Sequence, residues 1–140
     1  MSLSAVRTYF RDRLDSLDYN EWTDGFNFDN IPETISTDTY HLTTGVISVE
    51  RSNHLVNRFT YPVTIRVFFL GYNNPAEAID TAISASEDIL ADILSPANRL
   101  GTSIKDVFPS TITVEPRAES NDNSVILVME FNADIFCNFT

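Results

Sequence analysis

Basic residues are scarce in this sequence. Its 140 residues include 20 Asp and Glu but only 9 Lys and Arg, which gives a formal net charge of -11 and a pI near 4.3. A surface this acidic repels phosphate groups, which argues against specific nucleic-acid binding and against binding to anionic membranes. It is still compatible with DNA that passes close by without being bound.

Cysteine and glycine are also rare. The single cysteine, Cys137, excludes an internal disulfide and favours a reducing compartment, and we interpret it as a small half-buried hydrophobic residue. The four glycines form no phosphate-binding loop, and there is no G-x-S-x-G elbow, no cysteine pair for zinc and no H-E-x-x-H helix. No apolar run is long enough to span a membrane, and we expect neither a secretion signal nor membrane association.

The segment 59–70 has an apolar residue at every odd position, which is the pattern of a strand with one face on a core. We expect it to be the central strand of a sheet. Asn74 suits a helix N-cap and Pro75 the first position of a helix over residues 75–94, which Pro96 cannot continue. The predicted buried stripe of this helix contains Ile79, Ala82, Ile83, Ser86, Ile89, Leu90, Ile93 and Leu94.

Further segments with a clear period complete the expected fold. Residues 3–17 carry a helical apolar stripe with three arginines around it. Residues 39–49 are predicted to form a strand interrupted near Gly45. Residues 111–115 and 124–135 alternate between apolar and polar side chains and are predicted to form the two arms of a hairpin.

Other segments lack a sustained period. Residues 18–37 are predicted to be a long ordered connection, residues 97–103 a loop, and residues 104–108 a short turn or helical piece closed by Pro109. A chain of this length can bury a single core without staples. We therefore predict one α+β domain over residues 1–140, a mainly antiparallel β-sheet of about four strands packed by two helices, in the order α-β-β-α-β-β.

Side chains able to carry out chemistry are few. Only His41 and His54 titrate near neutral pH; His41 lies in a predicted strand and His54 in a polar connection. Asp24, Asn27 and Asp29 lack the alternating oxygen ligands and closing glutamate of a calcium loop. We therefore expect no enzyme activity, no metal and no cofactor. A small hydrolase that uses the carboxylates and His41 is the weakest alternative.

The order of the segments is more informative for comparison with known families than any single motif. The chain runs through helix 3–17, the irregular segment 26–33, Tyr40-His-Leu-Thr-Thr-Gly45 opening a hairpin with a polar tip, strand 63–68, the Asn74-Pro75-Ala76 helix start and a last hairpin through Val114-Glu-Pro116. With this layout the sequence resembles, over nearly its whole length, the tail terminator (tail completion) proteins of long-tailed bacteriophages.

This resemblance implies a small domain that assembles into a hexameric ring. The ring caps the growing tail tube, so that its polymerisation ends, and then offers the surface to which the filled head docks. The implied partners are further copies of the chain, the tail tube protein and a head completion or connector protein, with DNA passing through and no membrane. The implied location is the head-proximal end of the virion tail, after assembly in the host cytoplasm. An acidic lumen would keep DNA from adhering.

A closed ring requires a heterologous interface, in which one patch of each subunit meets a different patch of the next. We predict that Arg7 and Arg11 of the first helix face the acidic side of helix 75–94 in the neighbouring subunit, at Glu87 and Asp88. Two polar connections are predicted to contact tube or head proteins. Their candidate residues are Arg51, His54 and Arg58 in the first connection and Arg117 and Glu119 in the second.

Two other interpretations stay open. The protein could be another head-to-tail connector or stopper component, or a tail-tube ring protein, because all of these use small β-rich subunits. From a different class, it could be a small α+β ligand-binding or regulatory module in which the long helix and the sheet flank a pocket.

Overall fold

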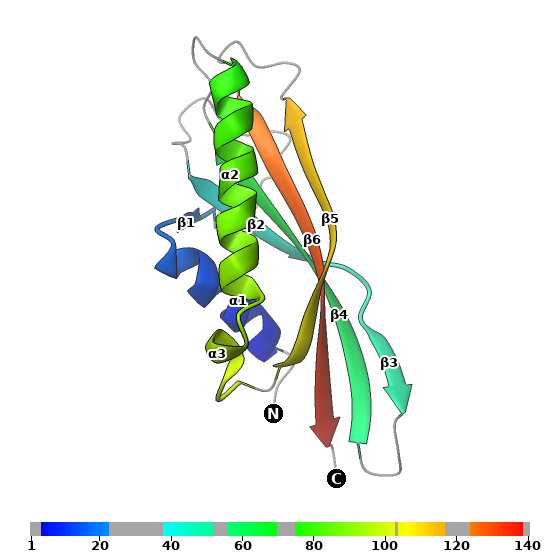
Figure 1. Cartoon of the computed structure of the whole chain (residues 1–140). Coiled ribbons are helices and arrows are strands. Elements are labelled where there is room, and N and C mark those ends of the chain that lie inside the picture. The colour runs from blue at the N-terminus through cyan, green and yellow to red at the C-terminus, as the bar shows by residue number, and fades with distance from the viewer. Residues whose placement is uncertain are drawn as a thin grey trace.

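The computed structural model describes residues 4–22, 38–51, 56–69, 75–102, 104–116 and 124–138. These residues form one six-stranded sheet with the helices on one of its faces (Figure 1). The elements in chain order are α1 (Ser4–Ser16), β1 (Asn20–Glu21), β2 (Thr39–Thr44), β3 (Ser48–Arg51), β4 (Val56–Phe69), α2 (Pro75–Ile93), α3 (Pro96–Arg99), β5 (Ile104–Pro116) and β6 (Val125–Asn138).

The strands are arranged in the order β1-β2-β4-β6-β5, and β3 pairs with β4 on the same side as β2. All pairs are antiparallel except β1 with β2. The predicted α+β class with a mainly antiparallel sheet is therefore confirmed. The predicted count of about four strands and two helices is wrong, because the sheet has six strands and the described chain has three helices.

One of the additional strands arises from a break in the predicted strand 39–49, next to Pro62 of β4. The predicted strand 39–49 is divided into β2 and β3, which pair with different parts of β4. Pro62 has no N–H to donate, yet its carbonyl accepts a hydrogen bond of 3.1 Å from the Gly45 N–H. A Cβ at Gly45 would lie 3.0 Å from the Pro62 ring, so the close approach at this break favours glycine.

The other main difference between the predicted and the observed fold is at β5. Residues 104–108 were predicted to be a turn or helical piece, but they belong to a strand that continues to Pro116. The ladder with β6 is irregular between Ile104 and Asp106 and between Pro109 and Thr111. A proline is tolerated in this strand because it lies at the edge of the sheet and next to an irregularity in the ladder.

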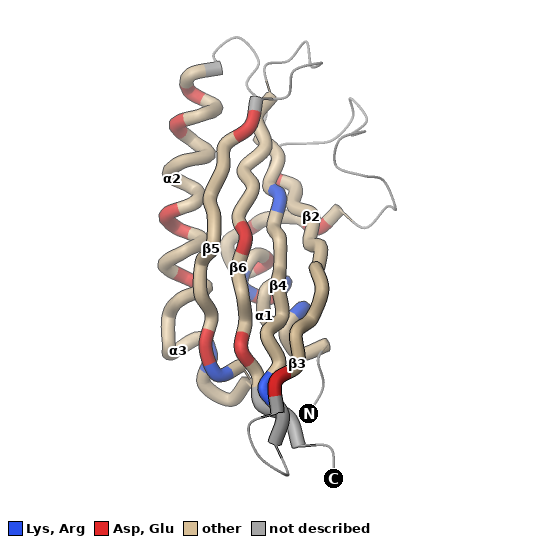
Figure 2. The backbone as a smooth tube through the Cα atoms, turned by 90° about the vertical axis from the view of Figure 1, so that its right-hand side faces the viewer, with Lys and Arg blue, Asp and Glu red and all other residues tan. Residues whose placement is uncertain are grey.

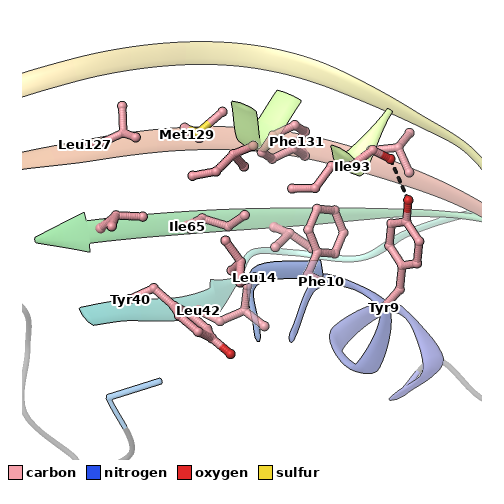
Figure 3. Packing of buried hydrophobic residues seen from close by; sticks show 14 of the residues in the cluster. Tyr9, Phe10, Leu14, Tyr40, Leu42, Ile65, Ile93, Leu127, Met129 and Phe131 are labelled. Carbon is pink, nitrogen blue, oxygen red and sulfur yellow. Dashed lines mark hydrogen bonds between the residues drawn. The ribbon is translucent and has the colours of Figure 1, made fainter. Parts of the chain in front are cut away.

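The central strand behaves as its alternation predicts. All odd residues of β4 from Phe59 to Phe69 are buried, and they lie on the face that carries the helices together with the alternate apolar residues of β6. The α1 stripe is confirmed at Val6, Phe10 and Leu14, which are fully buried. The α1 and β6 aromatic rings Phe10 and Phe131 pack with their centroids 5.5 Å apart (Figure 3).

Helix α2 lies on the sheet with a slightly different face from the predicted one. Ala82, Ser86, Ile89 and Ile93 are buried as expected. Ile79 and Ile83 are 37% and 46% exposed, so their predicted burial is wrong, and Ala78 and Ala85 are buried in their place. The small alanine side chains allow the helix backbone to lie close to the sheet, and this rotation turns the two isoleucines outward.

The two longer helices are joined by a buried hydrogen bond. The Tyr9 hydroxyl of α1 donates a hydrogen bond of 2.5 Å to the carbonyl of Ile93, the last residue of α2 (Figure 3). Carbonyl groups at the end of a helix have no partner within the helix. Tyr9 therefore satisfies a buried acceptor and fixes the end of α2 against α1.

We predict that Ile89→Ala lowers the free energy of unfolding much more than Ile83→Ala does. Ile89 is fully buried, so its truncation leaves a cavity and should lower the free energy of unfolding by about 2 to 5 kcal/mol. Ile83 is half exposed, and its truncation should cost about 0.5 kcal/mol or less. Urea unfolding of the two variants measures both values, and equal losses would contradict the orientation of α2.

We also predict that Tyr9→Phe lowers the free energy of unfolding by about 1 to 3 kcal/mol, because it leaves the buried Ile93 carbonyl without its donor. Tyr61→Phe is the matched control. Tyr61 is equally buried but makes no side-chain hydrogen bond among the described residues, so its hydroxyl contributes little. Equal urea midpoints for the two variants would show that the Tyr9 hydrogen bond is not needed.

Candidate interaction surfaces

The outer face of α2 carries several acidic side chains. Glu77, Asp80, Glu87 and Asp88 are all exposed, and residues 67–98 contain no lysine or arginine. Figure 2 shows the acidic positions spaced along the whole length of this helix. Like charges spaced along one helix repel each other, so a cationic partner surface would be favoured here.

Most described arginines form ion pairs with carboxylates of the same chain. Their ion pairs join Arg11 to Glu21 at 3.1 Å, Arg13 to Asp92 at 3.7 Å, Arg58 to Asp134 at 2.6 Å and Arg99 to Asp106 at 3.0 Å. The pair between Arg13 and Asp92 links α1 to α2 of the same chain. Arg11, predicted to face a neighbouring subunit, has its charge balanced by Glu21.

The shortest of these pairs joins β4 to β6. Asp134 is only 5% exposed, and its carboxylate accepts hydrogen bonds from Arg58 and from the Thr60 hydroxyl. The hydrogen bond and the charge of Asp134 raise the pKa of Arg58. Glu50 of β3 lies 3.8 Å from the same guanidinium group, so the base of the β3–β4 hairpin is held by a three-residue charge network.

A second group of polar residues lies on the face of the sheet opposite α2. His41 of β2 and Arg66 of β4 are direct partners in the ladder and both are half-buried. Burial, helped by the charges of Arg66 and Arg7, lowers the pKa of His41, while Glu21 opposes this. Arg7 itself belongs to α1, on the face of the sheet that the helices cover.

The same face also carries a small apolar cluster near one end of the sheet. Phe68 and Ile126 are buried there, with Trp22 and Val128 packed against them. Trp22 directly follows β1, in the region 18–37 that was predicted to be a long ordered connection. The rest of this face consists mainly of threonine and charged side chains.

The predicted contact residues are spread over the molecule. Glu87 and Asp88 are exposed on α2, Arg7 and Arg11 are half-buried on α1, and Arg58 is bound by Asp134. Arg51 ends β3, but its side chain and the residues His54, Arg117 and Glu119 lie outside the described residues. Residues 24–29, including Asp24, Asn27 and Asp29, also lie outside them, as do the predicted N-cap Asn74 and the side chain of Cys137.

The sequence interpretation did not single out Arg66, the ladder partner of His41. Its only signal was a charged side chain at an even position of an otherwise apolar strand. The register that places it beside His41 follows from the β2–β4 pairing, which no local pattern specifies.

The two polar connections start from opposite ends of the sheet. β4 pairs with β6 from Val56 opposite Asn138 to Phe69 opposite Val125. The β3–β4 connection therefore joins one end of this strand pair, and the β5–β6 connection joins the other end. Strands of 14 residues place these ends roughly 40 Å apart.

The described part of the chain contains no group of three or more His, Cys, Asp or Glu side chains that could hold a metal ion. No helix among the described residues is long and apolar enough to cross a membrane. The sequence matches no protein-family model, and a search of curated proteins finds no significant relative.

We predict that His41 makes the fold less stable at acid pH. Its pKa in the folded state is lower than the ordinary value near 6.5, so the unfolded chain takes up a proton first as the pH falls. Stability is therefore lost as the pH falls below about 6.5. Urea midpoints at pH 7.5 and 5.5 should differ less for His41→Gln than for the unmodified protein.

His54→Gln is the control for this measurement, because it removes the only other histidine. Carboxylate titration affects both variants equally at these pH values. An unchanged pH dependence in His41→Gln, or greater stability at pH 5.5, would contradict the assigned direction of the shift.

Proposed function

We propose that the protein is a structural virion protein of the tail terminator type. In this role a ring of subunits caps the phage tail tube at its head-proximal end, ends tail polymerisation and provides the surface for head attachment. The observation that carries the proposal is the separation of the two polar connections by the full length of β4 and β6. A subunit that joins two different assemblies needs two such ends.

The two ends differ in their surroundings. The β3–β4 end carries the network of Arg58, Asp134 and Glu50, which fixes the base of the hairpin. The β5–β6 end lies beside the apolar cluster of Phe68 and Ile126. Different chemistry at the two ends fits binding to two different partners, the tail tube protein and a head completion or connector protein.

The charge of the protein fits a channel for DNA. With a formal net charge of -11, a ring of six subunits would surround its lumen with a strongly negative field. A passing genome would be repelled from the walls and would not adhere to them. Because salt screens such repulsion over about 8 Å at physiological ionic strength, it acts only close to the wall.

The sheet also fits assembly into a ring. Among the described residues the helices cover only one face, and β5 forms a long edge that pairs only with β6 (Figures 1 and 2). Such a subunit has chemically different sides, which a heterologous, head-to-tail interface requires. The proposed location is the virion tail, with assembly in the host cytoplasm.

The proposal is tested by adding the purified protein to growing tail tubes and measuring tail length by electron microscopy. We expect tails of uniform length with a ring at one end, and a ring mass in native mass spectrometry. Tubes that continue to grow, beside a protein that stays monomeric, would overturn the proposed function. Rings within the tube wall or on the head alone would favour a tail-tube or connector role.

Two variants test the roles of the β3–β4 end and the β5–β6 end separately. Replacing residues 52–55 by Asn-Gly should abolish capping of the tube, whereas removing residues 118–122 should preserve capping and abolish head joining. Both variants should keep the free energy of unfolding of the unmodified protein within about 0.5 kcal/mol, because the strands that flank the two connections are retained. Normal capping by the first variant would contradict the role assigned to the β3–β4 end.

A further inference from the structure

The apolar stripe of α2 is wider than the part of it that this chain buries. Ile79 and Ile83 continue the helical period of the buried residues, yet they are 37% and 46% exposed. Asp92 lies on the opposite flank of the helix, where it pairs with Arg13 of α1. The two isoleucines therefore lie on the side of α2 away from α1, and this side follows the edge of the sheet that β5 forms (Figures 1 and 2).

The neighbouring strand is also open to solvent. Residues 108–113 of β5 are all exposed. Ile112 lies opposite Met129 on the face that the helices cover, and it is nevertheless 43% exposed. Ile79, Ile83 and Ile112 are thus exposed apolar side chains on the two elements that border this edge, and we call them the edge patch.

The two halves of β5 differ as sites for a further strand. The first half contains Lys105, Pro109 and two irregularities in its ladder with β6, all of which hinder the addition of a strand. The second half, residues 111–115, has a regular ladder with β6 and contains neither lysine nor proline. Among the described residues β5 pairs only with β6, so the backbone groups of residues 111–115 that point outward have no strand partner there.

We propose that residues 111–115 bind one extended segment of another protein, which adds a strand to the sheet next to β5. Main-chain hydrogen bonds would hold the segment, and every second side chain would lie against the edge patch. The added strand would complete the burial of Ile79 and Ile83 that the helical period indicates. This surface is separate from both polar connections, so the inference does not depend on the proposed capping of tails.

The charges around this edge indicate the chemistry of the segment. Exposed carboxylates lie on both sides of it: Glu115 and Glu130 on the face away from the helices, and Asp80 and Glu87 on α2, three and four residues from Ile83. The Glu130 carboxylate accepts a hydrogen bond of 2.7 Å from the Thr111 hydroxyl, which places it beside β5. Arg66 of the same face is two strands away in β4, and Lys105 is six residues from Thr111 along β5. The edge therefore favours a segment whose apolar residues face the edge patch and alternate with lysine or arginine beside Glu115 and Glu130.

A second copy of this chain does not supply such a segment. In a strand, cations on one face stand two positions apart. The only basic residues of the sequence with this spacing are Arg11 and Arg13, and both lie in α1. The net charge of -11 also opposes the approach of a copy to an acidic edge. The partner is therefore a different protein with a cationic segment in which every second residue is apolar.

Binding of short synthetic peptides tests the proposal. The probe is the fluorescein-labelled peptide Lys-Val-Lys-Val-Lys-Val-Lys, and its affinity for the protein is measured by fluorescence anisotropy at low salt. We expect it to bind about tenfold or more tightly than the same peptide with glutamate at the lysine positions. A proline in place of the central valine should remove most of the binding, because proline has no N–H to donate to a strand. Added salt should weaken binding of the lysine peptide.

Variants of the protein locate the site. The double variant Ile79→Ser, Ile83→Ser should bind the probe about tenfold more weakly, because it removes two apolar side chains that the peptide covers. Val46→Ser, Val49→Ser is the matched control, since these valines are 86% and 61% exposed in and just before β3, on the opposite side of the sheet from β5. The control should bind the probe as the unmodified protein does.

A second pair of variants tests the charge. Glu115→Gln removes a carboxylate from the edge, whereas Asp12→Asn removes one from the exposed side of α1. The first should weaken binding of the probe about threefold at low salt. The second should leave binding unchanged, although it alters the net charge of the protein by the same amount.

Amide hydrogen exchange shows where the peptide binds. In the free protein the amides of residues 111–115 that do not bond to β6 should exchange fast, because they face solvent. Bound peptide should slow them about tenfold or more. The amides of β3 should exchange at the same rate with and without peptide.

Four results would overturn the inference. Two of them are equal binding of the lysine and glutamate peptides and an equal loss of binding in the isoleucine and valine variants. The third is protection of the amides of residues 111–115 in the free, dilute protein, which would show that the chain itself covers this edge. The fourth is protection that rises with protein concentration in the absence of peptide, which would show that a second copy covers it.

Tail capping is scored separately from peptide binding. If the peptide does not bind and tails are still capped, the proposed function stands and the inference falls. If the peptide binds at residues 111–115 and tails are not capped, the inference stands and the proposed function falls.

Discussion

The pairing of β4 with β6 is the interaction on which the rest of the structure depends. It runs without interruption from Val56 opposite Asn138 to Phe69 opposite Val125. This register brings the odd residues of both strands to one face, where they meet α1 and α2. The same two strands carry β2 and β3 on one side and β5 on the other. They also set the distance between the two polar connections, so one antiparallel ladder determines both the core and the ends that we assign to two partners.

Charge is distributed by the same architecture. Ion pairs between elements, such as Arg13 with Asp92 and Arg58 with Asp134, fix α1 on α2 and β4 on β6. Exposed carboxylates lie on the outer side of α2, and Arg66, His41 and Glu130 lie on the opposite side of the sheet.

Much of the fold could be predicted from local patterns. The alternation of 59–70 and 124–135 and the helical period of 75–94 predict β4, β6 and α2, although β4 begins three residues earlier and β6 ends three residues later than predicted. Prediction failed where the outcome depends on distant residues. Pro109 signals a break, but a position at the sheet edge tolerates it within β5. Ile79 and Ile83 match the helical period, yet Ala78 and Ala85 pack closer to the sheet.

The sequence by itself determined the periods of the elements, the strongly acidic character and the scarcity of basic side chains, because these are properties of neighbouring residues and of composition. Only the tertiary structure decided that Tyr9 binds the Ile93 carbonyl, that Arg11 is paired with Glu21, and that His41 lies beside Arg66. The reason is physical: strand register and helix rotation are set by contacts between segments far apart in the chain, and a shift of one residue would move every side chain to the other face.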